Sequence, residues 1–212
     1  MRTRYLWILA LAVMLGGGAA RADTGNLSIG GTFNYVPTSV GDEGGGSVTV
    51  STLNGVTLNW LYCVDLNDVV YVPGTYNNTT ITSNGMANEN GAFQTVNNAG
   101  EVAWLLDHYA NSANGDTNAE VALQAAIWNV IYGVGLNPSS VYYNSTIGTD
   151  YNNDLNGLGS APLSTVLWIS PGDGSGTIYQ GLAGSVPDGG LTLMLLGGAL
   201  VGLEALRRVC RV

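Results

Sequence analysis

The chain has 212 residues, of which 15 are acidic and only six are Lys or Arg, and its formal net charge is −9. All six basic residues lie in the first 21 or the last six positions, so residues 23–185 contain no Lys or Arg. Binding to nucleic acid needs basic side chains that displace phosphate counterions, so this composition excludes a nucleic-acid-binding body and argues against adhesion to anionic lipid.

Residues 1–22 have the three-part layout of a secretory signal peptide. Arg2 and Arg4 precede an apolar run at 6–15, and Ala20-Arg21-Ala22 closes the segment with small residues. We predict cleavage after Ala22. The alternative, an uncleaved membrane anchor, fits less well because the apolar run is short for a bilayer span.

The next part of the chain predicts β-strands joined by turns. Asn54-Gly55 is a strong hairpin signal and Asn84-Gly85 marks another turn. The glycine-rich stretch GDEGGG at 41–46 predicts a turn or a mobile loop. Alternation of apolar and polar residues predicts strands at 26–36, 47–53, 56–64 and 78–83.

Two helices follow, because the apolar residues change to a helical period. The first is predicted at 100–110, where one face is apolar. The second, at 117–133, is apolar almost all round and is therefore expected to be buried, with Asn118 as its N-cap and Gly133 as its stop. A short helix near 149–156 and closing strands at 164–170 and 176–182 complete the body.

These elements predict the fold class α+β, with residues 23–185 forming a single β-rich domain around two central helices. The C-terminal segment has a second apolar run at 191–206, which Glu204 interrupts near its end. Arginines follow this run, and basic residues beside a span stay on the cytoplasmic side. We therefore predict a transmembrane helix with the body outside. The alternative is a buried C-terminal helix of a soluble domain.

The C-terminal segment resembles the PEP-CTERM class of sorting signals, in the variant that begins Val-Pro-Asp. The resemblance rests on three parts in order: Val186-Pro187-Asp188-Gly189-Gly190, the apolar run, and Arg207 with Arg208. It covers residues 186–212. It implies export in a Gram-negative bacterium, an exosortase-type protease as a partner, and a place on the cell surface or in the extracellular polysaccharide matrix, after an inner-membrane-anchored precursor.

Two residues of the body are unusual for their surroundings. Cys63 is the only cysteine at 23–185, whereas exported cysteines usually pair. It is predicted on the strand face opposite Leu58, Trp60 and Tyr62. Gln124 stands in the apolar helix, where an amide without hydrogen-bond partners costs about 1–3 kcal/mol.

Together, Tyr62-Cys63-Val64 and Leu123-Gln124-Ala125-Ala126 resemble the thioester domains of bacterial surface adhesins. In that family an aromatic-Cys-aliphatic motif supplies the sulfur, and a glutamine on a downstream hydrophobic helix supplies the acyl carbon. The resemblance covers 61–133, and Leu123 departs from the threonine that often precedes the glutamine. It implies a Cys63–Gln124 thioester that reacts with surface amines and attaches the protein covalently to its target. It implies neither a cofactor nor a turnover enzyme.

Other interpretations of these residues stay open. Cys63 could be an inert buried thiol or form an intermolecular disulfide, and Gln124 could simply hydrogen-bond neighbouring backbone. The protein would then be a non-covalent structural or carbohydrate-binding component of the matrix. No motif predicts a metal site. His108 is expected to be a solvated residue, and the aspartates Asp65, Asp68 and Asp173 are expected to lie in solvated turns.

Overall fold

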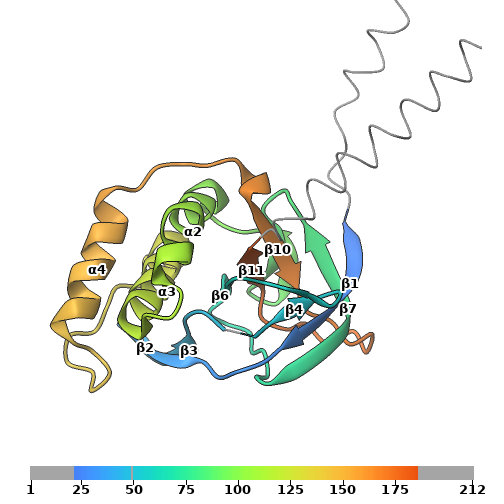
Figure 1. Cartoon of the computed structure of the whole chain (residues 1–212), viewed down its shortest axis with the longest axis horizontal. Coiled ribbons are helices and arrows are strands. Elements are labelled where there is room, and N and C mark those ends of the chain that lie inside the picture. Colours follow the sequence, from blue (N-terminus) through green and yellow to red (C-terminus); the bar gives the residue numbers. More distant parts are fainter. Residues whose placement is uncertain (1–21, 49, 186–212) are drawn as a thin grey trace, which may run out of the picture.

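The computed structural model describes residues 22–48 and 50–185, which form a seven-stranded antiparallel sheet with three helices packed on one side (Figure 1). The predicted signal peptide falls almost entirely outside these residues, and the predicted sorting motif and transmembrane helix fall wholly outside them. Within the described ranges, no helix is long and apolar enough to cross a membrane.

The sheet curls so that its two outer strands approach each other. Its order is β5 (Val56–Thr57), β4 (Thr52–Leu53), β1 (Asp23–Ile29), β7 (Gly74–Thr82), β10 (Val166–Ser170), β11 (Leu182–Ser185) and β6 (Leu61–Cys63). The outer strands β5 and β6 are separated by only residues 58–60, and four residue steps span at most about 14 Å. The curl is therefore imposed by the chain itself. The Val48 N–H also donates to the Leu61 carbonyl at 3.1 Å.

Three of the four predicted N-terminal strands are interrupted in the structure. Segment 26–36 is divided between β1 and β2 (Asn34–Thr38), which lie in different sheets, with Gly31 in the left-handed region at φ 72° between them. Segment 47–53 is strand only at β4, because Val50 turns the chain at φ 64°. Segment 56–64 is divided between β5 and β6. Period-2 alternation shows which side of the chain is apolar, but not where the chain leaves a sheet.

Two hairpins lie outside the large sheet. β2 pairs with β3 (Gly41–Gly45), and β8 (Met86–Glu89) pairs with β9 (Ala92–Thr95). The prediction of a loop at 41–46 was therefore wrong for β3. Its glycines carry no side-chain pattern, but their backbone pairs regularly with β2. The predicted Asn54-Gly55 hairpin is confirmed, with both residues at positive φ between β4 and β5.

Within the described residues the α-helices are α2 (Ala99–Ala113), α3 (Thr117–Tyr132) and α4 (Ser145–Asn156), so both predicted central helices and the additional short helix are confirmed. The short helix predicted near 149–156 begins four residues earlier, where Asn144 caps it. The N-cap of α3 is Asp116, not Asn118, because the Asp116 carboxylate accepts from two backbone N–H groups of the first turn. The Gly133 stop is confirmed at φ 72°.

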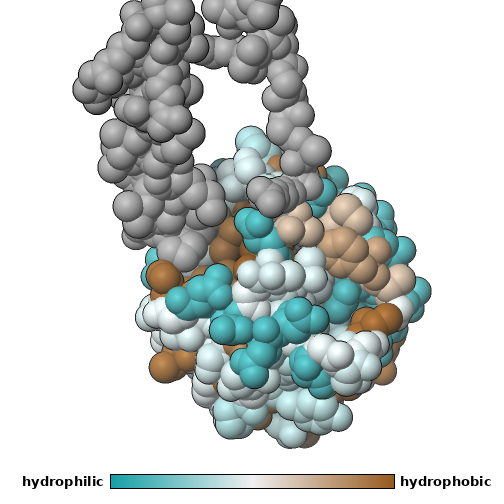
Figure 2. Space-filling view, turned by 90° about the vertical axis from the view of Figure 1, so that its right-hand side faces the viewer, coloured by the Kyte–Doolittle hydropathy of each residue, from teal (hydrophilic) through white to brown (hydrophobic). Residues whose placement is uncertain are grey.

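The strand β6 runs between two hydrophobic clusters, and this position sets up the site. Trp60 and Tyr62 belong to the cluster shared with α2 and the inner side of α3, whereas Cys63 belongs to the other cluster. The predicted alternation is thus confirmed at 60–63. Leu58, expected with Tyr62, lies instead in the Cys63 cluster. The outer face seen in Figure 2 mixes hydrophilic residues with smaller apolar areas.

The closing strands differ in part from the prediction. β10 confirms the segment 164–170, after a short 3-10 turn at Leu163–Thr165. Residues 176–181, predicted as strand, are irregular, and β11 follows them. Figure 1 shows α4 as the outermost helix, with α2 and α3 between it and the sheet. The helix that carries Gln124 is therefore enclosed, which explains its all-round apolar sequence.

Candidate functional site

The Gln124 carboxamide occupies the free edge of β6. On the other edge, Val64 N–H and the Trp60 carbonyl pair with the backbone around β11. The N–H and C=O of Cys63 therefore point away from the sheet. The Cys63 N–H donates to Gln124 Oε1 at 2.9 Å, and Gln124 Nε2 donates to the Cys63 carbonyl at 2.8 Å. The amide thus replaces a neighbouring strand and lies beside the residue that carries the thiol.

The β2–β3 hairpin supplies a third contact. The Gly46 N–H donates to Gln124 Oε1 at 3.3 Å, so two backbone N–H groups converge on this oxygen. A Cβ at Gly45 would lie 2.7 Å from the Gln124 Cγ and 2.8 Å from the Trp128 ring, so only glycine allows this close approach. Sequence reasoning missed both glycines. No local sequence signal marks them, because Gly46 and Gln124 are 78 positions apart in the chain.

The thiol and the carboxamide are fully buried. Cys63 and Gln124 are each 0% exposed, and Tyr62, which precedes Cys63, and Trp128, one helical turn after Gln124, are equally buried. Burial raises the pKa of the Cys63 thiol far above its ordinary value, and the nearby Asp65 charge raises it further. The sulfur is therefore a neutral thiol rather than a thiolate, and it is shielded from reagents in solution.

These contacts have two chemical consequences. A carbonyl oxygen that accepts two fixed N–H bonds is stabilised when it gains negative charge, as it does when a nucleophile adds to the carbonyl carbon. The same three hydrogen bonds also satisfy a buried glutamine whose role is only structural. The geometry therefore brings Cys63 and Gln124 together and fits both interpretations of the pair.

Comparison with known protein families gives one match. Residues 60–158 match the family model of the thioester domain. The matched range contains both Cys63 and Gln124 and extends past α4. It begins after the β2–β3 hairpin, so Gly46 lies outside it. No curated protein and no solved structure matches the chain. The match supports a thioester-domain body.

The remaining sequence candidates have different environments. His108 is about half-exposed, and its ring stacks on Trp104. Asp173 is in an exposed turn, as expected, where Ser175 and Tyr179 hydroxyls donate to it and hold its pKa at about 2. The prediction that Asp65 is solvated was wrong. Its side chain is 0% exposed, and burial raises its pKa to about 6.

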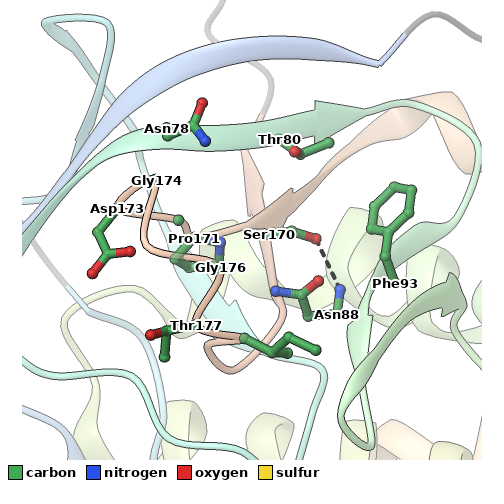
Figure 3. Close-up of a pocket in the computed structure, with 12 residues that line it drawn as sticks. Asn78, Thr80, Asn88, Phe93, Ser170, Pro171, Asp173, Gly174, Gly176 and Thr177 are labelled. Carbon is green, nitrogen blue, oxygen red and sulfur yellow. Dashed lines mark hydrogen bonds between the residues drawn. The ribbon is translucent and has the colours of Figure 1, made fainter.

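A separate polar cavity of about 330 Å³ opens beside β7, β9 and the β10–β11 loop (Figure 3). We call it the polar cavity. Asn78, Thr80 and Asn88 line it together with the exposed ring of Phe93, and Ser170 lies at its base. The Ser170 hydroxyl accepts from the Asn88 N–H at 2.8 Å, which fixes the position of both. Sequence analysis did not anticipate this group, because its members come from four separate segments.

Proposed function

We propose that Cys63 and Gln124 form an internal thioester through which the protein attaches covalently to amines on an extracellular target. The observation that carries this proposal is the seating of the Gln124 carboxamide on the Cys63 backbone within a region that matches the thioester-domain family. The protein would act once per molecule, as an attachment module rather than as a turnover enzyme, and it would need no cofactor.

Thioester formation follows from the arrangement. The Cys63 sulfur adds to the Gln124 side-chain carbon, the C–N bond breaks, and the nitrogen leaves as ammonia with the thiol proton. The N–H groups of Cys63 and Gly46 stabilise the oxyanion during addition. Fixed proximity replaces an activated leaving group. Tyr62 and Trp128 are fully buried together with Cys63 and Gln124, and this burial then protects the thioester from water.

The reaction with a target amine releases the Cys63 sulfur again. A primary amine of the target adds to the same carbon, the C–S bond breaks, and the sulfur leaves as a thiol. An amide between Gln124 and the target remains. The absence of Lys from residues 23–185 is consistent with this role, because a lysine-free domain has no side-chain amine that competes with the target.

The place of action is a further part of the proposal. The N-terminal signal-peptide pattern and the C-terminal sorting pattern support export, membrane anchoring of the precursor and processing by an exosortase-type protease. Surface amines or the extracellular polysaccharide would then be the partners. The acidic, lysine-free body suits a protein that works outside the cell.

Accurate mass of the purified protein tests the thioester. The wild-type chain is expected to be lighter than its sequence by one ammonia, and methylamine is expected to add to Gln124 while exposing one thiol. Cys63→Ala should have the unmodified mass and should not take up methylamine. A wild-type mass equal to the sequence, with Cys63 alkylated under native conditions, would contradict the proposal.

A second candidate function is the binding of a neutral carbohydrate, and the polar cavity favours it. Its volume of about 330 Å³ is within the range of small-molecule sites, and it offers amide and hydroxyl groups beside the half-exposed Phe93 ring. Saturation-transfer NMR with methyl hexosides tests this role. Phe93→Ala is expected to abolish the transfer, and unchanged transfer would count against the cavity as the binding site.

A further inference from the structure

A second cavity lies where the three helices meet, and we call it the acidic cavity. Its volume is about 220 Å³, and its wall includes Leu123, the residue before Gln124. The helix α2 contributes Tyr109 and Ser112. The helix α4 contributes Asp150 and Asp154, one helical turn apart, and the exposed Asn153.

The carboxylate of Asp154 has an unusual environment. The residue is 7% exposed, and no side chain or backbone group of the described residues donates a hydrogen bond to it. Burial raises its pKa to about 7, and the charge of Asp150 adds to this rise. No Lys or Arg exists at 23–185, and His108 faces the Trp104 carbonyl. The cavity therefore presents a buried acid for which the described part of the chain offers no internal cation.

Two buried hydroxyl groups belong to the segments that contact the Gln124 carboxamide. The hydroxyls of Tyr62 and Ser47 are buried and have no hydrogen-bond partner among the described residues. Burial raises the pKa of the Tyr62 phenol, and the carboxylates of Glu120 and Asp154 raise it further. The Ser47 hydroxyl is close enough to oppose this rise, although the two oxygens do not meet hydrogen-bond geometry.

Ser47 and Tyr62 are next in sequence to residues that contact the Gln124 carbonyl. Ser47 follows Gly46, whose N–H donates to Gln124 Oε1, and Tyr62 precedes Cys63. Unpartnered buried polar atoms are rare and call for an explanation. Here both hydroxyls belong to residues next in sequence to the two backbone donors of the Gln124 carbonyl, Gly46 and Cys63. A ligand whose end carries hydrogen-bond donors would supply hydrogen bonds to the Tyr62 and Ser47 hydroxyl oxygens.

We propose that the acidic cavity binds the alkylammonium group of the amine nucleophile, with Asp154 as its counter-charge, and directs that amine to the acyl carbon of Gln124. This inference rests on the proposed thioester. The ammonium gives one proton to the Asp154 carboxylate, and the free amine adds to the Gln124 carbon. The C–S bond then breaks, and the sulfur takes up the second amine proton as the thiol re-forms.

The lining favours an alkylammonium ion over a metal ion. Leu123 and two alanines offer apolar surface for a hydrocarbon stem, beside the Tyr109 ring. Within the described residues, no group of three or more His, Cys, Asp or Glu side chains is placed to hold a metal. A single cation with an apolar stem matches two carboxylates on one side of an otherwise uncharged cavity.

The first test compares a cationic and an uncharged nucleophile. The full-length chain carries Cys210→Ser, so that Cys63 is the only thiol, and the mass before treatment reports thioester formation. Ethylamine is cationic at neutral pH, whereas hydroxylamine is largely uncharged. Asp154→Asn is expected to slow ethylamine addition at least about tenfold and to leave hydroxylamine addition and ammonia loss unchanged. Asp107→Asn, on the exposed side of α2, is the matched control and should change none of these rates.

Equal ethylamine rates in wild type and Asp154→Asn, or equal slowing with both nucleophiles, would overturn the inference. A second measurement does not depend on the thioester. In Cys63→Ala, which cannot react, the Asp154 carboxyl ¹³C signal is expected to shift saturably with ethylammonium chloride and not with ethanol. A wild-type protein that retains its ammonia would refute the proposed function alone. A missing ethylammonium shift would refute the cavity assignment.

Discussion

Free-energy coupling between Cys63 and Gln124 is the sharpest test of the proposed covalent bond. The two residues hydrogen-bond only through the Cys63 backbone, so Cys63→Ala keeps all three contacts of the Gln124 amide. Without a thioester, the substitution removes one buried atom of about methylene size and costs about 1 kcal/mol. With a thioester, it also removes a crosslink between positions 61 residues apart.

The size of the crosslink term follows from that separation. Closing a loop of 61 residues lowers the entropy of the unfolded chain by an amount worth on the order of 4 kcal/mol at 25 °C. Cys63→Ala is therefore expected to lower the free energy of unfolding by about 5 kcal/mol in the wild-type background. In a domain of this size, the crosslink's share of this loss, about 4 kcal/mol, by itself lowers the midpoint of thermal unfolding by roughly 8–16 °C.

A double-mutant cycle separates the crosslink from packing. Gln124→Glu is the background because a protonated carboxyl can accept from Cys63 and Gly46 and donate to the Cys63 carbonyl, yet it releases no ammonia. Burial favours the protonated form, so the cycle is measured by urea unfolding at about pH 5. In this background Cys63→Ala is expected to cost only about 1 kcal/mol, giving a coupling of about 4 kcal/mol. A coupling below about 1 kcal/mol would show that no bond joins the sulfur to the carboxamide.

Three further predictions address the surroundings of the pair. Gly45→Ala brings a Cβ to 2.7 Å from the Gln124 Cγ, so it should destabilise the fold by about 1–3 kcal/mol in urea unfolding and lower the fraction of chains that lose ammonia. Asp116→Ala removes the N-cap of α3 and should cost about 1 kcal/mol while leaving the ammonia loss complete, which separates helix stability from site geometry. The folded-state pKa of Asp154 is raised from its ordinary value of 3.8 to about 7, so its stabilising contribution is complete below about pH 4 and is lost as the pH rises through 7. Asp154→Asn should therefore gain stability relative to wild type between pH 4 and 8, by on the order of 2 kcal/mol because solvent screens the partly exposed carboxyl, and parallel stability curves for the two proteins would contradict the pKa assignment.

Local patterns in the sequence were enough to predict the elements that carry the site. The all-apolar period of 117–133 predicted the buried helix α3, and a single amide within it marked Gln124. The lone Cys63 was conspicuous for a similar local reason, because exported cysteines usually pair. Residues whose chemistry conflicts with their surroundings can be recognised without a structure, because the conflict is contained in a few neighbouring positions.

The arrangement around the pair depends on contacts between distant segments. No local pattern shows that β6 is an edge strand, because that follows from the curled sheet and the pairing of β11 with β6. The glycines of 41–46 read as a loop, yet one donates to Gln124 across 78 positions of sequence. Burial of Asp154 likewise depends on α4 closing over α2 and α3. Sequence thus determined which groups could react, while the tertiary structure decided their neighbours, because hydrogen bonds and desolvation act over ångströms in space and not over positions in the chain.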